Sequence, residues 1–122
     1  MSVFKKILNW LPALLWMALI FFMSSQTGLG GPEWMSVAGH IVEYGGLAAL
    51  LYFALSRTTG LAHLKIAALA AAMATLYGLT DEWHQSFVPG RVPDVMDLLT
   101  DFSASTLVAM SAALALRRVT KR

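Results

Sequence analysis

Four long apolar runs divide the chain and restrict it to a membrane fold. The first, residues 7–23, contains 17 residues without a formal charge, which is close to the length that crosses the hydrocarbon core of a bilayer as a helix. Similar runs cover residues 36–56, 61–83 and 94–116. Apolar side chains make up 57% of the 122 residues, a large share for a soluble domain of this size. The sequence therefore predicts an all-α fold, with four transmembrane helices in a single domain over residues 1–122.

Removal of the first run as a signal peptide is the alternative, because Lys5 and Lys6 precede it. However, the run is longer than the apolar part of a typical signal peptide, and no A-x-A cleavage site follows it. Three more apolar runs come after it. We therefore interpret residues 7–23 as the first transmembrane helix.

Basic and acidic residues are sorted to opposite ends of the predicted helices. With four spans, both termini and the middle turn lie on one side of the membrane, and 8 of the 9 basic residues fall there. Positive charge marks the cytoplasmic side, so we predict cytoplasmic termini in a bacterial-type plasma membrane. All 7 acidic residues then lie in the extracytoplasmic half. Because the basic residues are split over three short anchors, nucleic-acid binding is not expected.

Segment 80–101 contains most of the candidate chemistry. It holds five of the 7 acidic residues together with Arg91, although charges near a bilayer core are costly and generally functional. Asp97 and Asp101 are four residues apart, on one face of the fourth helix. At a 1.5 Å rise per residue, Asp101 lies roughly 10 Å beyond the helix start, too deep for a cap. We predict that it points into the bundle toward His40 or Tyr44, with Tyr44 the better placed.

The predicted outer pocket combines ionisable and hydrogen-bonding side chains. The candidate catalytic residues are Asp81, Glu82, His40, Asp97 and Asp101. The candidate substrate-binding residues are Arg91, Gln85, Tyr44, Glu43, Ser25 and Gln26. The planar guanidinium of Arg91 suits a phosphate or carboxylate. Since Arg91 is the one basic residue among the outer acids, it is also predicted to contact Asp81, Glu82, Asp94 or Asp97.

These residues resemble the VanZ-like family of small integral membrane proteins. Ser24, Ser25 and Gln26 are similar to the family's Ser-Ser-Gln after its first span, and His40 with Tyr44 to its His-x-x-x-Tyr. The strongest similarity is to D-E-x-x-Q-x-F-x-P-G-R, from Asp81 to Arg91, followed by Asp97. Asp101 stands where asparagine is common, and Ala104 where glycine is common. The resemblance implies a link to tolerance of teicoplanin-type glycopeptides, but it supplies no reaction.

Three kinds of function fit these residues. In a non-enzymatic protein that binds an envelope or lipid-linked ligand, or that is purely structural, Arg91 would be the counter-ion of partly buried acids. A membrane enzyme would use paired carboxylates as general acid and base on a lipid-linked or phosphate-bearing substrate. Four short spans also suit a small drug or ion exporter, although the first span lacks a deep ionisable group. The lipid bilayer is the expected partner, and the oligomeric state is left open.

The sequence contains no recognisable cofactor or metal motif. The chain has no cysteine, which excludes disulfides and thiolate ligands. His40 and His84 lie near several carboxylates in the predicted fold, but no compact pattern such as H-E-x-x-H is present. We therefore predict no cofactor and no bound metal.

Overall fold

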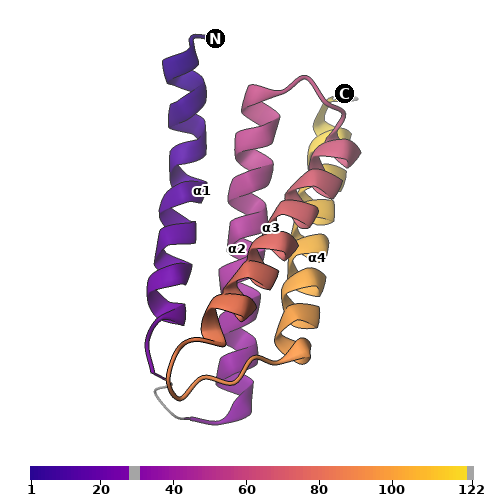
Figure 1. Cartoon of the computed structure of the whole chain (residues 1–122). Helices are drawn as coiled ribbons and strands as arrows, with labels where there is room; N and C mark the ends of the chain where they lie inside the picture. The colour runs from indigo at the N-terminus through magenta and orange to yellow at the C-terminus, as the bar shows by residue number, and fades with distance from the viewer. Residues whose placement is uncertain (28–30, 121–122) are drawn as a thin grey trace.

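The computed structural model describes residues 1–27 and 31–120, which form four α-helices and no strand (Figure 1). The helices are α1 (Val3–Ser24), α2 (Glu33–Thr58), α3 (His63–Gln85) and α4 (Val95–Thr120). All four are long and apolar enough to cross a membrane. The predicted all-α, four-span fold is therefore confirmed, and the chain is a multi-pass membrane protein.

Successive helices run in opposite directions. The N-terminus, the turn between α2 and α3, and the C-terminal end of α4 consequently lie at one end of the bundle (Figure 1). The helix α4 packs against both α2 and α3, whereas α1 packs mainly against α2 and makes only a few contacts with α3. A three-helix core of α2, α3 and α4 thus has α1 along one edge.

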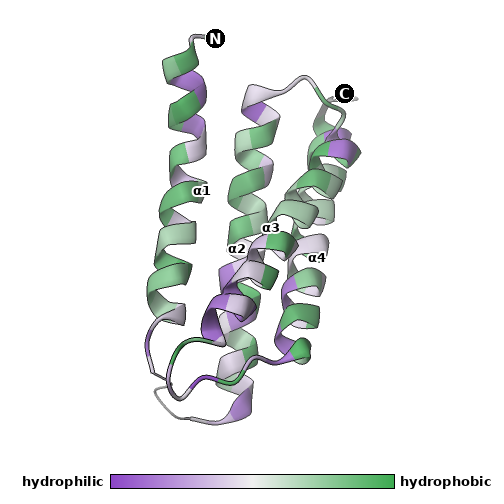
Figure 2. Ribbon diagram, viewed as in Figure 1, coloured by the Kyte–Doolittle hydropathy of each residue, from purple (hydrophilic) through white to green (hydrophobic). Residues whose placement is uncertain are grey.

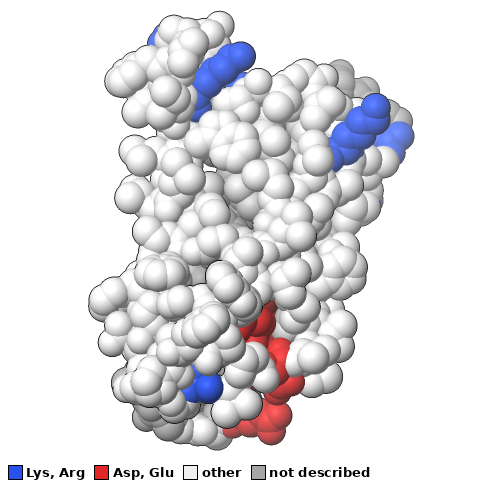
Figure 3. Space-filling view, in the orientation of Figure 1, with Lys and Arg blue, Asp and Glu red and all other residues white. Residues whose placement is uncertain are grey.

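Charge is sorted along the bundle as the sequence predicts. Hydrophilic residues gather toward the C-terminal end of α3 and the start of α4, while apolar residues cover most of the helices (Figure 2). Acidic atoms lie at this end, which we call the acidic end, and most Lys and Arg atoms lie at the opposite, basic end (Figure 3). Which end faces the cytoplasm stays a prediction.

Short polar residues and prolines set the helix starts. Ser2 Oγ accepts a hydrogen bond from the Lys5 backbone N–H at 3.3 Å, so α1 begins before the apolar run predicted from the sequence. Pro32 directly precedes α2, where its missing N–H costs little. Asp94 Oδ1 accepts from the Met96 N–H at 2.8 Å, so Asp94 caps the start of α4.

Small residues bring the core helices close together. Ala67, Ala70 and Ala74 of α3 are fully buried, in one cluster with Leu47 and Leu51 of α2. Small side chains allow membrane helices to approach closely, as the alanine-rich segment of α3 predicts. The fully buried alanines carry no polar side-chain group, so the middle of α3 contributes an apolar surface to the core.

Two hydrogen bonds attach α1 to the core near its middle. Trp16 Nε1 donates to the backbone oxygen of Glu43 at 2.8 Å, and the Tyr77 hydroxyl donates to the Met17 backbone oxygen at 2.6 Å. The Trp16 ring lies against Gly46, where an added Cβ would come within 2.9 Å of it. This close contact holds α1 in place, so that its C-terminal half, which lies toward the acidic end, forms one wall of the candidate site.

Candidate functional site

Five acidic, amide or imidazole side chains from three helices are buried at the acidic end. They are His40 of α2, Asp81, Glu82 and Gln85 of α3, and Asp101 of α4. Each is at most 7% exposed, and Asp101 is completely buried. Buried polar groups need hydrogen-bond partners. The partners of these five side chains therefore show which groups are satisfied within the protein and which are left for a ligand.

The first pair in the site is His40 with Asp101. His40 Nδ1 lies 2.7 Å from Asp101 Oδ1, and His40 Nε2 lies 3.5 Å from Asp97 Oδ2. Asp101 therefore points into the bundle toward His40, as predicted. The preference for Tyr44 was wrong, because the imidazole spans the helical turn between Asp97 and Asp101 and reaches the deeper carboxylate itself.

The second pair is Tyr44 with Asp81. The Tyr44 hydroxyl donates to Asp81 Oδ2 at 3.0 Å, and Gln85 Nε2 donates to the same oxygen at 3.4 Å. The Ser105 hydroxyl donates to the Tyr44 backbone oxygen at 3.3 Å, which links this pair to α4. The Tyr44 side chain thus joins α2 to α3, and its backbone oxygen joins α2 to α4.

Glu82 connects the end of α3 to the start of α4. Its Oε2 accepts a hydrogen bond from the Asp94 backbone N–H at 3.0 Å, where a negative charge near a helix N-terminus is favourable. Its other oxygen, Oε1, is buried without a partner, and so is Asp101 Oδ2. One nitrogen of His40 and one carboxylate oxygen each of Glu82 and Asp101 lie within 4.8 Å of one another. These three residues are the ones placed to hold a cation.

Arg91 does not pair with the acids. Its Nε donates to the Gln26 backbone oxygen at 2.8 Å and its Nη2 to the Met23 backbone oxygen at 3.0 Å. No ion pair joins it to a described carboxylate, so the prediction that it contacts Asp81, Glu82, Asp94 or Asp97 was wrong. Met23, near the end of α1, and Gln26, just after it, present backbone oxygens at the negative end of the helix dipole, and these oxygens attract the guanidinium instead.

A pocket of about 570 Å³ opens at the acidic end beside these groups. Its polar lining includes His40, Glu43, Asp81, Gln85 and Arg91. Apolar side chains of α1 and α2, among them Phe22, Met23 and Met35, form much of the remainder. The volume falls within the range of ligand sites in proteins, and its lining is amphiphilic.

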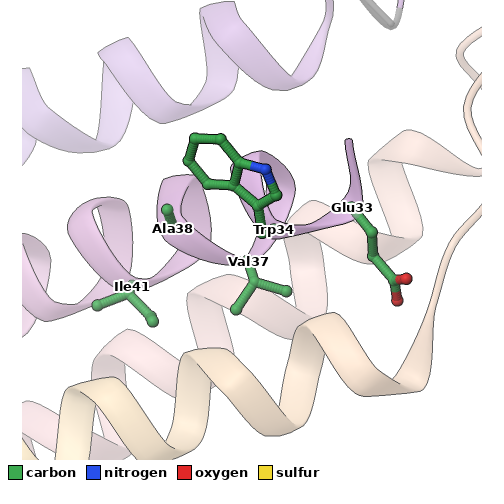
Figure 4. A pocket seen from close by; sticks show the side chains of 5 residues that line it. All are labelled: Glu33, Trp34, Val37, Ala38 and Ile41. Atoms are coloured by element: carbon green, nitrogen blue, oxygen red, sulfur yellow. The ribbon is translucent and has the colours of Figure 1, made fainter. Parts of the chain in front are cut away.

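A second hollow of the described surface is a poor candidate site. It has a volume of about 440 Å³ and lies on the outer face of α2, lined by Glu33, Trp34, Val37, Ala38 and Ile41 (Figure 4). All five residues are exposed, and Glu33 is the one ionisable group among them. Apolar side chains that face outward from a membrane helix are typical of lipid contact.

The predicted site residues are only partly gathered. One connected cluster contains seven of them, namely His40, Tyr44, Asp81, Glu82, Gln85, Asp97 and Asp101. Glu43 lines the pocket beside this cluster. Gln26 lines the pocket and holds Arg91 through its backbone oxygen. Ser25 lies apart, because its hydroxyl donates to the Phe21 backbone oxygen at 2.7 Å. The catalytic and binding roles of these residues stay predictions.

Gly78 is a site residue that the sequence reasoning missed. An added Cβ there would lie 2.8 Å from Asp101 Oδ2 and 3.2 Å from Tyr44 Cε1. The glycine therefore makes the room in which the Asp101 carboxylate lies. A glycine in the interior of a predicted helix, one turn before Glu82, is the signal that would have found it.

The fold and the site define a small multi-pass membrane protein with a buried polar centre at one end of a helix bundle. The family model VanZ/LLP1 matches residues 33–116, which is more than half of the chain. The chain belongs to this family, as the sequence resemblance predicts. The matched region begins at α2, so the Ser24–Gln26 similarity lies outside it. No curated protein and no solved structure matches the chain.

Proposed function

We propose that this protein binds an amphiphilic, lipid-linked ligand of the cell envelope in the pocket at its acidic end. The observation that carries the proposal is the lining of the 570 Å³ pocket, where His40, Glu43 and Asp81 face apolar side chains of α1 and α2. A polar head group with an attached apolar chain needs both kinds of surface. A pocket for a wholly polar or wholly apolar ligand would be lined by one kind.

The polar lining favours a head group that offers hydrogen-bond donors. The Glu43 and Asp81 carboxylates accept hydrogen bonds, and hydroxyl and amide groups of sugars or peptides donate them. Arg91 lies at the rim and uses two of its five N–H donors on the end of α1. Its remaining N–H groups suit a phosphate that links the head group to its lipid chain. A polyprenyl phosphate-linked sugar or peptide carries all of these groups.

The proposed orientation follows from charge. Among the described residues, six of the seven basic ones, all but Arg91, lie at or near the basic end, which the positive-inside rule places in the cytoplasm. The pocket would then open on the extracytoplasmic side of a bacterial plasma membrane, where lipid-linked wall precursors are used. Tolerance of teicoplanin-type glycopeptides is the cellular effect that we propose for this binding.

A membrane enzyme is the second candidate, and the pair of His40 with Asp101 favours it. A buried carboxylate 2.7 Å from one ring nitrogen fixes the orientation of an imidazole, which is an arrangement used for general acid–base catalysis. His40 also lines the pocket. Turnover of a lipid-linked substrate by the wild type but not by a His40→Gln variant would support the enzyme over the binding protein.

Lipid binding can be tested by native mass spectrometry of the protein in detergent. The probes are a polyprenyl diphosphate-linked sugar and, for comparison, phosphatidylglycerol. Gly39 lines the pocket and has no atom within 4 Å of an added Cβ, so Gly39→Phe fills the pocket without a clash at that carbon. Gly60, in the turn between α2 and α3, has equally open surroundings, and Gly60→Phe is the matched control.

We expect the wild type and Gly60→Phe to bind the polyprenyl probe at least about tenfold more tightly than phosphatidylglycerol, a difference of about 1.4 kcal/mol. Gly39→Phe is expected to lose that preference. In a teicoplanin-susceptible bacterium, the wild type should raise the inhibitory concentration and Gly39→Phe should not. Equal binding of the polyprenyl probe by the wild type and Gly39→Phe would refute the proposed pocket.

A further inference from the structure

The acidic end contains more carboxylate groups than the cationic side chains around them can pair with. The carboxylates gathered there are Glu43, Asp81, Glu82, Asp97 and Asp101. Within the described chain, the one ion-pairing cationic group among them is the His40 imidazole, because Arg91 is turned to the carbonyls of α1. Buried charges are generally paired or coordinate metals, so this cluster calls for a further positive charge.

The position of that charge is indicated by two unpaired oxygens. Glu82 Oε1 and Asp101 Oδ2 are buried and have no hydrogen-bond partner, in residues that are 7% and 0% exposed. Both residues belong to the group in which His40, Glu82 and Asp101 bring one ligand atom each to within 4.8 Å of one another. The three residues come from three different helices, so the packing of the core, and not a local sequence motif, assembles the group.

We propose that His40, Glu82 and Asp101 bind a divalent transition-metal ion, such as Zn²⁺ or Mn²⁺. One imidazole nitrogen with two carboxylates is a mixed ligand set that suits these ions, whereas Mg²⁺ and Ca²⁺ prefer oxygen ligands alone. The sequence prediction of no metal rested on the absence of a compact motif, and ligands from three separate helices leave no such motif.

Metal binding would require the ligand atoms, which now lie within 4.8 Å of one another, to adjust to the spacing of a coordination shell. In a tetrahedral site, metal–ligand bonds of about 2.0 to 2.2 Å place neighbouring ligand atoms roughly 3.3 to 3.6 Å apart. His40 Nδ1 and Asp101 Oδ1 are 2.7 Å apart as a hydrogen-bonded pair, so binding would replace the shared proton and separate the two atoms slightly. Asp97 Oδ2, at 3.5 Å from His40 Nε2, orients the other side of the ring, as carboxylates commonly do for metal-bound histidine.

This inference goes beyond the proposed ligand pocket and does not depend on it. The test uses the whole protein in detergent, without added lipid, after treatment with a chelator. Zn²⁺, Mn²⁺, Mg²⁺ and Ca²⁺ are titrated separately by calorimetry, and the stoichiometry is measured by elemental analysis. Co²⁺ serves as a spectroscopic probe, because its visible absorption reports the ligand set.

The variants are chosen so that loss of folding is not mistaken for loss of a ligand. Glu82→Gln keeps an oxygen that accepts from the Asp94 N–H, and Asp101→Asn keeps one that accepts from His40. Glu43→Gln is the matched control, since it removes one negative charge beside the pocket from a residue outside the three-residue group. Helix content by circular dichroism is compared for all variants.

We expect one Zn²⁺ or Mn²⁺ ion per chain, with Mg²⁺ and Ca²⁺ bound at least about tenfold more weakly. Glu82→Gln and Asp101→Asn should each weaken binding by more than the roughly 10- to 100-fold typical of an outer-sphere residue, while Glu43→Gln should change it less than about threefold. The Co²⁺ spectrum should change in the first two variants only. Absence of binding, equal binding of Ca²⁺, or an equal loss in Glu43→Gln would overturn the proposal.

Discussion

Replacement of Gly78 by alanine is expected to strain the centre of the site. An added Cβ would lie 2.8 Å from Asp101 Oδ2, closer than real Cβ atoms approach a neighbour. The carboxylate has little freedom to retreat, because Asp101 is completely buried and held 2.7 Å from His40. The new methyl group must therefore push α3 and α4 apart or weaken the contact between Asp101 and His40.

The size of this effect follows from two opposed contributions. Adding a methyl group to a well-packed core destabilises the fold by about 1 to 3 kcal/mol. Alanine is favoured over glycine inside a helix by roughly 0.8 to 1 kcal/mol. Gly78→Ala is therefore expected to lower the free energy of unfolding by about 0 to 2 kcal/mol.

Gly39→Ala isolates the packing contribution. Gly39 lies inside α2, and its added Cβ has no atom within 4 Å, so this variant should gain only the helix preference of alanine. The difference in unfolding free energy between the two variants should then equal the packing cost, about 1 to 3 kcal/mol. Both are measured by titration of the micelle-bound protein with a denaturing detergent, followed by circular dichroism. Equal stability of Gly78→Ala and Gly39→Ala would refute the close contact of Gly78 with Asp101.

Three further predictions concern the hydrogen bonds and the topology. Tyr44→Phe removes the 3.0 Å hydrogen bond to Asp81 and should cost about 1.5 to 3 kcal/mol in the same titration. Tyr52→Phe removes a part-buried hydrogen bond to His63 at the basic end, and a loss for Tyr44→Phe no larger than for Tyr52→Phe would contradict the prediction. Arg91→Ala removes the hydrogen bonds to Gln26 and Met23 and should cost about 1 to 2 kcal/mol, whereas a loss of roughly 3 to 5 would indicate a broken buried ion pair. A single cysteine at Arg57, in a chain with no other cysteine, should react with membrane-impermeant reagents only after the cells are opened; labelling of intact cells would exclude cytoplasmic placement of this turn.

The fold was predictable because a bilayer allows few choices. Every backbone polar group inside hydrocarbon must be satisfied within the chain, which leaves helices for apolar runs of this length. The four runs therefore predict α1 to α4 almost directly. The ends were less well predicted: α1 begins at Val3, because Ser2 caps a turn that also includes Lys5 and Lys6, and charge alone does not end a helix.

The sequence predicted most of the residues that make up the site, but it did not predict which of them contact one another. Spacing along a helix gives the face and depth of a residue, so the inward direction of Asp101 followed from its position. The spacing does not give the rotation and tilt of the helices, which decide whether His40 or Tyr44 reaches the Asp101 carboxylate. Arg91 was assigned to the acids by counting charged side chains alone, a count that leaves out the carbonyls at the end of α1.

A purely structural role explains some of the buried polar groups but not all of them. The Tyr44 hydroxyl and Asp81 Oδ2 satisfy each other at 3.0 Å, and such a pair can simply fix the packing of α2 against α3. Glu82 Oε1 and Asp101 Oδ2 have no partner, and each unsatisfied buried group costs about 1 to 3 kcal/mol. The other oxygen of each residue is bonded, Glu82 Oε2 to the Asp94 N–H and Asp101 Oδ1 to His40, and these bonds leave the cost of the two unpaired oxygens without compensation. These two oxygens are therefore better explained by a group that binds between α3 and α4 than by the stability of the fold.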